Sequence, residues 1–250
     1  MKNAYESPFS TRYASEEMQY LFSADKKFKT WRRLWVALAR AEMKLGLPVT
    51  EEQVKELESH VDDINYDVAQ AREKQVRHDV MSHVYAYGVQ CPNAKGIIHL
   101  GATSCYVGDN TDVIIMKEAL LVVRRKLINV IHLLANFAEE YKSMPALAYT
   151  HLQPAQLTTV GKRATLWINE LLMDLEDLDY RVSTLKLLGS KGTTGTQASF
   201  LDLFDGDSKK IDELEQMIAE EMGFTKVVPV SGQTYSRKMD SQVLAVLSGI

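Results

Sequence analysis

The sequence is poor in cysteine, has no acceptor for N-linked glycosylation and lacks a long apolar run. Its two cysteines, Cys91 and Cys105, are too few and too isolated for a disulfide framework. No segment reaches the roughly 20 apolar residues that a membrane-spanning helix needs, and residues 1–12 lack the apolar core of a signal peptide. These absences disfavour secreted and membrane proteins. They predict a cytoplasmic location and no membrane partner.

The charges are nearly balanced, with 29 Lys and Arg against 33 Asp and Glu and a net charge of -4. Because no long block of positive charge is present, a nucleic-acid-binding surface is disfavoured. The histidines and cysteines show none of the usual metal-ligand spacings, and residues 191–196 lack the residue order of a phosphate-binding P-loop. We therefore expect neither a metal site nor a nucleoside triphosphate site.

Apolar residues recur at helical spacing along most of the chain. Residues 28–45 form an amphipathic pattern that ends at a glycine followed by a proline, which predicts a helix. Thr50 and Gln53 have the spacing of a capping box, so a second helix is expected to start there. A third helix is expected over residues 66–87, with a break near His78.

Two longer helices are predicted next. One runs from a cap at Asp109 or Asn110 to about residue 142, a length of ~50 Å, and the other spans residues 161–188. Their apolar residues cover more than one face, as in a helix bundle or at a subunit interface. Shorter helices are expected over residues 208–222 and after residue 233. Residues 226–230 are the one β-like run of note.

The sequence therefore predicts an all-α fold. We expect a small N-terminal helical domain over residues 1–103 and the first part of a central long-helix bundle over residues 104–250. The boundary falls in residues 88–108, which are rich in glycine and turn-forming residues. Because the helical pattern has no stop signal at Ile250, we expect the chain to be truncated within a domain.

Three polar segments interrupt the helical pattern. They are Arg77-His78-Asp79, Gly101-Ala102-Thr103-Ser104, and residues 150–156, Thr-His-Leu-Gln-Pro-Ala-Gln. In the last, Pro154 prevents a helix from running through, so His151 is expected on a turn or extended stretch. An imidazole there is suited to proton transfer, because its ordinary pKa of about 6.5 lies near neutrality.

The residues alone leave other interpretations of these segments open. A histidine such as His151 is more often structural than catalytic. Arg77 and Asp79 are also compatible with a solvated ion pair, and Thr103 and Ser104 with helix capping.

Two of the segments, taken in their wider context, resemble signature regions of the fumarase/aspartase superfamily. The first is residues 101–112, which contain Gly-Ala-Thr-Ser and then Val-Gly-Asp-Asn-Thr-Asp, and the second is residues 150–163. Within the superfamily, the sequence is similar to adenylosuccinate lyases of the animal type. That similarity extends over essentially the whole chain and is carried further by residues 7–13, 77–79, 191–200 and 233–235.

The resemblance implies a lyase of purine biosynthesis. Its substrates are adenylosuccinate, which gives AMP, and the succinylated aminoimidazole carboxamide ribotide, and each releases fumarate. A base removes a proton next to a carboxylate, and an acid protonates the departing nitrogen. By the family pattern His151 is the general acid, and His78 lies close by to bind substrate and support the proton transfer. No cofactor and no metal is expected.

The resemblance also assigns contacts with this small-molecule substrate. Arg12 and Tyr13 match a pair that holds phosphate oxygens, for which guanidinium and phenol groups are suited. The other substrate-binding residues are Arg77, His78, Asp79, Thr103, Ser104, Thr150 and Gln233. The family implies a homotetramer in which three subunits contribute to each active site.

The sequence departs from the family pattern in one respect. The third signature, a Gly-Ser-Ser-x-Met-Pro-x-Lys-x-Asn loop that supplies the serine base, is absent from the sequence. It is expected downstream of Ile250, so we expect this chain alone to be inactive. Two alternatives remain open. One is another superfamily lyase, acting on argininosuccinate, aspartate or malate, and the other is a non-catalytic helical assembly module.

Overall fold

The computed structural model describes residues 7–250, which form two compact units. Unit 1 combines the residues up to Met116 with Lys186–Ser236, and unit 2 combines Lys117–Leu185 with Arg237–Ile250. The boundary predicted after residue 103 lies at the start of helix α6 (Ser104–Glu140), whereas the units divide within that helix. Because each unit is built from two segments that are far apart in sequence, a single cut of the chain cannot separate them.

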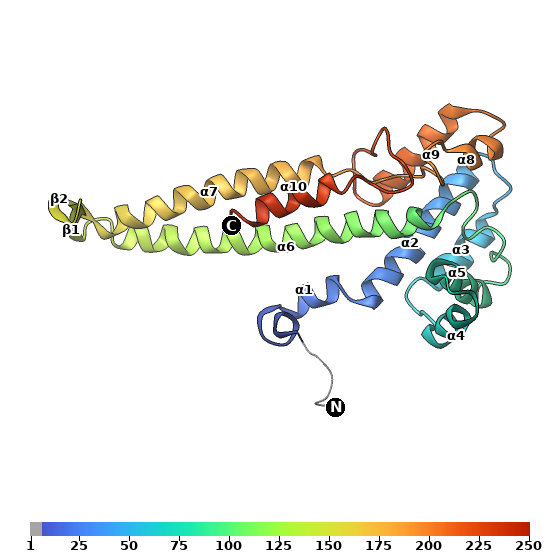
Figure 1. The fold of residues 1–250 in the computed structure, drawn as a ribbon, viewed down its shortest axis with the longest axis horizontal. Coiled ribbons are helices and arrows are strands. Elements are labelled where there is room, and N and C mark those ends of the chain that lie inside the picture. Colours follow the sequence, from blue (N-terminus) through green and yellow to red (C-terminus); the bar gives the residue numbers. More distant parts are fainter. Residues whose placement is uncertain (1–6) are drawn as a thin grey trace. The chain divides into compact units, whose positions relative to one another are not determined.

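Unit 1 is helical. Its elements are η1 (Phe9–Tyr13), α1 (Glu16–Leu21), α2 (Ala24–Lys44), α3 (Glu51–Ser59), α4 (Tyr66–Val76), α5 (Asp79–Gln90), the first turns of α6, α8 (Ala198–Leu203) and α9 (Ser208–Glu221). Helix α2 packs against α1, α3 and α9 (Figure 1). Of its 21 residues, 12 are buried. It therefore forms the core of this unit.

Aromatic side chains fill the space between α2 and α5. Phe28 stacks on His83 with ring centroids 3.8 Å apart, and Trp31 meets both rings edge-on. Burial lowers the pKa of His83 to about 4, so this imidazole is neutral at pH 7 and packs as an aromatic ring. Trp35 and Tyr87 continue the cluster with ring centroids 6.0 Å apart. The predicted helix over residues 28–45 is confirmed, and its apolar face makes this core.

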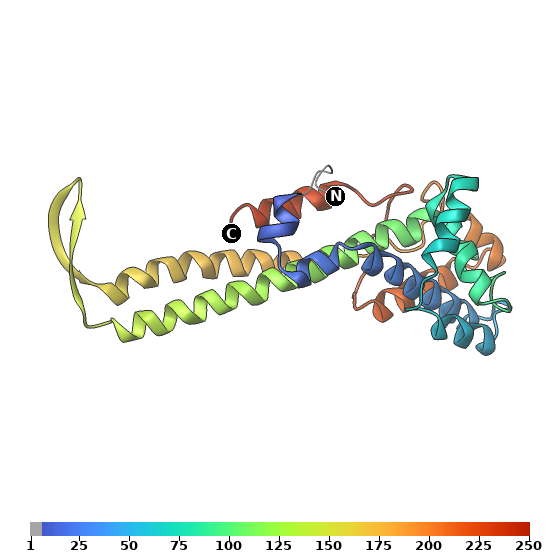
Figure 2. The same ribbon diagram turned by 90° about the horizontal axis from the view of Figure 1, so that it is seen from below.

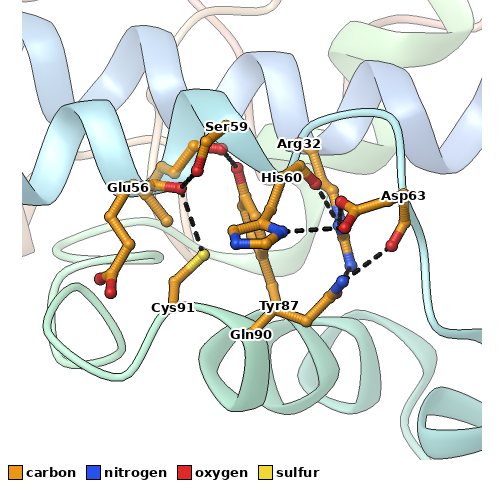
Figure 3. Close-up of polar contacts among 9 residues, drawn as sticks. Arg32, Glu56, Ser59, His60, Asp63, Tyr87, Gln90 and Cys91 are labelled. Atoms are coloured by element: carbon orange, nitrogen blue, oxygen red, sulfur yellow. Dashed lines mark hydrogen bonds and ion pairs between the residues drawn. The ribbon is translucent and has the colours of Figure 1, made fainter.

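A polar network holds α2 to the segment between α3 and α4 and to the end of α5 (Figure 3). The buried Arg32 guanidinium donates to the carbonyl of His60 and, at 2.6 Å, to Oε1 of Gln90. The Gln90 amide in turn donates to the carbonyl of Asp63 at 2.8 Å. The guanidinium also lies 4.3 Å from the centre of the Tyr87 ring. A buried charge is costly unless it is hydrogen-bonded, and this network satisfies it.

Unit 2 consists of two antiparallel helices joined by a β-hairpin, with a short third helix alongside. After the remainder of α6 come β1 (Pro145–Thr150), β2 (Gln153–Thr159), α7 (Val160–Thr184) and, later in the chain, α10 (Lys238–Leu247). Figures 1 and 2 both show α7 running back along α6, with the hairpin at the end of the pair. Arg124 and Asp179 link the two helices by hydrogen bonds of 2.5 and 3.1 Å.

The structure confirms the predicted predominance of helix and the break near His78, where α4 ends and α5 begins. The capping box is also present, because Thr50 and Gln53 each accept the other's backbone N–H. Two details of the predicted secondary structure were wrong. Helix α6 starts at Ser104, so Asp109 and Asn110 lie inside it, and the hairpin over residues 145–159 was missed. Within residues 7–250, no helix combines the length and apolar character needed to cross a membrane.

Candidate active site

His78 and Ser104 come from different segments of unit 1 and meet in the structure. His78 is the N-cap of α5, and Ser104 is the first residue of α6. The Nε2 atom of His78 lies 3.2 Å from Oγ of Ser104. Two of the three polar segments singled out in the sequence are therefore joined by a hydrogen bond. Spacing in the sequence could not reveal this, because 26 residues separate the pair.

The capping role of His78 determines which ring nitrogen carries the proton. Its Nδ1 atom accepts the backbone N–H of Met81 at 3.3 Å. A nitrogen that accepts has no hydrogen of its own, so the neutral ring is protonated on Nε2. Nε2 then donates to Oγ of Ser104, which leaves the serine hydroxyl hydrogen free to donate elsewhere. The pair can thus present an O–H donor to a carboxylate while the imidazole orients it.

Arg77 and Asp79 flank His78 in conformations set by the break between the two helices. Arg77 adopts a left-handed conformation with φ of 52° as the C-cap of α4, and its N–H donates to the carbonyl of Glu73 at 2.7 Å. Asp79 lies in the first turn of α5, where its Oδ1 atom accepts the N–H of Val80. All three residues of the Arg77-His78-Asp79 triplet are exposed, so they can reach a ligand from solvent.

Gly101 positions the segment that carries Thr103 and Ser104. Its φ of +65° lies in the left-handed region, and a Cβ atom there would come within 2.7 Å of Leu203 and 3.0 Å of Phe200. Only glycine accommodates both constraints without strain. The close approach holds residues 101–103 against α8 and leads directly into α6. Backbone N–H groups at the start of that helix favour anionic ligands, as do the hydroxyls of Thr103 and Ser104.

His151 lies in unit 2, at the tip of the hairpin. Thr150 pairs with Gln153 across the two strands, and His151 and Leu152 form the turn with φ values of 51° and 60°. Two successive left-handed residues define a type I′ turn, which normally favours Asn and Gly. Thr150 and His151 are exposed, and Leu152 is 97% exposed. The prediction of a turn at His151 is confirmed; histidine is among the non-glycine residues that adopt this left-handed conformation most readily, whereas leucine rarely does.

Gln233 and the pair Arg12 and Tyr13 occupy two other places in unit 1. Gln233 is exposed in the segment between α9 and α10. Arg12 and Tyr13 end the short helical turn η1, which buries none of its residues, and the guanidinium lies 5.7 Å from the centre of the Tyr13 ring. These side chains are accessible to a ligand, and the structure does not join them by hydrogen bonds to His78.

One ionisable residue near the candidate site was not singled out from the sequence. His99 lies two residues before Gly101, and its Nδ1 atom accepts the indole N–H of Trp35 at 2.9 Å. Burial, with a smaller contribution from the nearby His78, lowers the pKa of His99 to about 4. His99 is therefore neutral at pH 7. Its position two residues before the Gly-Ala-Thr-Ser segment was the one signal available in the sequence.

The described residues contain no group of three or more His, Cys, Asp or Glu side chains that could hold a metal ion. The functional groups available are instead imidazoles, hydroxyls, guanidinium groups and an amide. They come from η1, the α4–α5 junction, the start of α6, the hairpin turn and the Gln233 segment. The groups of unit 1 are suited to binding an anionic substrate, and the imidazoles of His78 in unit 1 and His151 in unit 2 are each suited to transferring a proton.

Comparisons with known proteins show the family to which the chain belongs. Residues 12–240 match the model of a protein family described as lyase. The chain is 54% identical to the adenylosuccinate lyase of Saccharomyces cerevisiae over 98% of its length and 51% of that protein. It is 51% identical to the adenylosuccinate lyase of Schizosaccharomyces pombe over 98% of its length and 52% of that protein. The chain thus spans about half the length of these relatives.

Among solved structures, the chain is similar to a fumarate lyase from Mesorhizobium sp. BNC1. The TM-score is 0.75 at 24% identity, over 98% of this chain and 56% of that one. At this identity the likeness shows the fold, and it confirms the predicted helical architecture. The chain therefore belongs to the lyase family, in the fumarase/aspartase superfamily, and its relatives there are adenylosuccinate lyases.

Proposed function

We propose that the protein of which these residues form the catalytic framework eliminates fumarate from adenylosuccinate, giving AMP, and from the succinylated aminoimidazole carboxamide ribotide. The observation that carries the proposal is the hydrogen-bonded pair His78 and Ser104. It occurs in a chain that is 54% identical to a yeast adenylosuccinate lyase. The reaction consumes a small-molecule substrate and belongs to purine biosynthesis. It requires neither cofactor nor metal, because acid and base groups suffice for this elimination.

His151 is the general acid of this proposal. Its exposed position at the hairpin turn supports the role, since an acid must reach the departing nitrogen of a bound substrate. His78 binds substrate through the Ser104 hydroxyl that it orients, and it supports the proton transfer. An imidazole held by a backbone N–H on one side is restricted to one tautomer, and this restriction suits a positioning role.

The remaining site residues bind the charged groups of the substrate. Arg12 and Tyr13 hold phosphate oxygens, and Arg77 and Asp79 make further contacts beside His78. Hydroxyl and amide groups hold a succinyl carboxylate, because they donate hydrogen bonds of the appropriate geometry. They belong to Thr103, Ser104, Thr150 and Gln233.

The functional assembly in this proposal is a homotetramer with active sites shared between subunits. Its support is a set of large apolar side chains that unit 2 leaves exposed. A soluble monomer rarely exposes so many in one region. They are Leu121, Ile128, Val130, Leu133, Phe137, Leu166, Trp167, Leu172, Met173 and Tyr180. The location is cytoplasmic, in agreement with free thiols at Cys91 and Cys105.

The test is an assay of the complete enzyme with adenylosuccinate, followed by absorbance. His151→Ala is expected to lower kcat by roughly 10²–10⁴-fold, the usual contribution of a general acid. His60→Ala serves as the matched control, because His60 lies in unit 1 and forms a surface contact with Asp63. Undiminished turnover in His151→Ala would remove the acid assignment.

The same assay separates the lyase from a second candidate, a non-catalytic helical assembly module. The exposed apolar surface of unit 2 favours that alternative as much as it favours a tetrameric enzyme. If the complete protein forms tetramers but releases no fumarate from either succinylated substrate, the assembly module is the correct interpretation.

A further inference from the structure

Two adjacent side chains of α6 each hold a different loop of unit 1. The loops are residues 186–197, here the glycine loop, and residues 229–236, here the Gln233 loop. Asn110 forms a pair of hydrogen bonds with Gly189: its amide donates to the carbonyl at 3.0 Å, and its Oδ1 accepts the N–H at 3.1 Å. Asp109 accepts the N–H of Tyr235 at 2.8 Å through Oδ2. Both α6 side chains are buried.

The two loops are also held to each other. A parallel bridge joins Leu187 to Val227, close to where the Gln233 loop begins. At the other end, Gly195 packs against Ser231 so closely that a Cβ atom on Gly195 would overlap the Ser231 carbonyl. The φ of Gly195 is +84°, so both its backbone and its surroundings favour glycine.

The glycine loop is itself fixed by a buried ion pair. The Lys191 ammonium lies 2.9 and 2.7 Å from the two carboxylate oxygens of Glu215 in α9. The Ser190 N–H donates to the same carboxylate at 2.7 Å. Burial raises the pKa of Glu215, and the Lys191 charge opposes that rise. A buried pair with additional hydrogen bonds holds one geometry, so the glycine loop is a rigid support for the Gln233 loop.

Gln233 lies between two of these fixed points. Ser231 meets Gly195 on one side of it, and Tyr235 is 3% exposed and bonded to Asp109 on the other. Gln233 itself is exposed. Asp109 is five residues after Ser104 in one continuous helix, a spacing of about 7.5 Å along the axis. One rigid element therefore carries both Ser104 and the anchor of the Gln233 loop.

We propose that Asp109 is a positioning residue that fixes the distance between Gln233 and the His78–Ser104 pair. This inference rests on the proposed function for the role of Gln233 in substrate binding. Asp109 acts through the Tyr235 backbone and does not touch substrate. Two carboxylate-binding groups must match the spacing of one succinyl group, and displacement of either by about 1 Å weakens productive binding.

Hydrogen exchange tests the mechanical part of the inference without reference to activity. In Asp109→Ala, the backbone N–H of Tyr235 loses its acceptor, and its exchange is expected to be about 5-fold faster or more. Asp109→Asn keeps an acceptor oxygen and is expected to remain within about 2-fold of the unchanged protein. The matched control is Tyr106→Phe, which removes a buried hydrogen bond of 2.7 Å from the same helix to Leu34. Unchanged exchange of the Gln233 loop in Asp109→Ala, or equal acceleration in Tyr106→Phe, would overturn the inference.

Kinetics of the complete enzyme test the consequence for substrate binding. Asp109→Ala is expected to lower kcat/KM for adenylosuccinate about 10-fold, mainly through KM. In the Gln233→Ala background, the same substitution should change kcat/KM by less than about 2-fold, because both act through one contact. Multiplicative losses in the double variant would overturn the inference. An unaltered KM in Gln233→Ala alone would instead remove Gln233 from the site, and the exchange experiment would still decide whether Asp109 fixes the loop.

Gly195→Ala keeps the inference testable if Asp109→Ala does not fold. It displaces Ser231 from the opposite side of the Gln233 loop and leaves α6 untouched. The expected result is a similar rise in KM that also vanishes in the Gln233→Ala background. A KM equal to that of the unchanged enzyme would show that the loop position does not matter for binding.

Discussion

Helices α2 and α7 are of similar length but differ greatly in burial. Twelve of the 21 residues of α2 are buried, against three of the 25 residues of α7. The difference does not come from a lack of apolar residues, since α7 exposes Leu166, Trp167, Leu172 and Met173. Unit 1 thus completes its core within the chain, whereas unit 2 keeps a large apolar surface in contact with water. Covering this apolar surface with another protein surface would lower the free energy of the system.

The two helices also differ in how their charged side chains are buried and paired. Helix α2 buries Glu42 completely, and neither carboxylate oxygen has a hydrogen-bond partner among the described residues. In helix α7 the ion pair that Asp179 forms with Arg124 of α6 is half-exposed. Unit 1 therefore buries a whole carboxyl group without a partner, whereas in α7 a single buried atom, Nε of Arg181, lacks one while the same guanidinium donates to Thr184 and Gln242.

The largest expected effect comes from truncating the same residue type in the two helices. Trp31→Ala in α2 should lower the free energy of unfolding by about 3–5 kcal/mol, because a 1% exposed indole leaves a cavity. Trp167→Ala in α7 removes an indole that is 55% exposed and should change it by less than about 0.5 kcal/mol in the monomer. Denaturant unfolding at low protein concentration measures both. Equal losses of unfolding free energy in the two variants would mean that Trp167 is packed within the monomer as tightly as Trp31.

The same Trp167→Ala variant sharpens the comparison at higher concentration. If unit 2 is covered by other subunits, this substitution should weaken assembly, measured by analytical ultracentrifugation, although it scarcely affects the monomer. Retention of the assembly would show that Trp167 lies outside the covered surface.

Glu42→Gln is expected to stabilise unit 1 with a clear dependence on pH. Burial raises the pKa of Glu42 to about 9 from an ordinary value of 4.5. Between these values the unfolded chain releases a proton that the folded chain retains, so stability falls as pH rises through this range. Because glutamine does not ionise, Glu42→Gln should raise the free energy of unfolding by about 3 kcal/mol near pH 7. At pH 4 the two proteins should have nearly equal stability.

Unfolding measured at pH 4, 6 and 8 decides this prediction. The comparison variant is Glu56→Gln, whose carboxylate is bonded to Asn93 and Ala94 and is not isolated. A gain that is independent of pH in Glu42→Gln would contradict a buried neutral carboxyl group.

The sequence was sufficient where structure depends on neighbouring residues. The α2 pattern, the capping box of Thr50 and Gln53, and the break at His78 depend on contacts within a few residues, and all three are present. The start of α6 was misplaced because Asp109 and Asn110 are good capping residues locally, yet both bind distant loops. The hairpin over residues 145–159 also depends on local pairing, but it was missed because its turn is His-Leu and not the Asn-Gly that marks such hairpins.

In the candidate site, too, the features that the sequence did not predict depend on contacts between residues far apart in the chain. The resemblance pointed to His78 and Ser104 separately, and the hydrogen bond that joins them depends on how α5 and α6 pack. His99 has no distinctive spacing, and its neutrality follows from burial beside Trp35. The catalytic and substrate-binding roles remain predictions for every assigned residue: Arg12, Tyr13, Arg77, His78, Asp79, Thr103, Ser104, Thr150, His151 and Gln233.

A smaller loss of stability is expected from a substitution where α6 and α7 approach each other closely in unit 2. Gly161, in the first turn of α7, lies against the end of α6, and a Cβ atom there would overlap the carbonyl oxygen of Ala138 and lie 2.7 Å from the Lys142 nitrogen. Its N–H also donates to the Tyr141 carbonyl at 2.9 Å. Gly161→Ala must separate the two helices, at a cost of about 1–3 kcal/mol. The higher helix propensity of alanine returns up to ~1 kcal/mol.

The net loss for Gly161→Ala should therefore be about 1–2 kcal/mol in denaturant unfolding. Gly108→Ala is the matched control, because Gly108 is also helical and a Cβ atom there would meet nothing within 4 Å. That substitution should stabilise the chain slightly, because alanine restricts the unfolded backbone. If Gly161→Ala proves stabilising as well, the two helices of unit 2 are free to move apart at this end. Tight packing would then be a property of unit 1 alone.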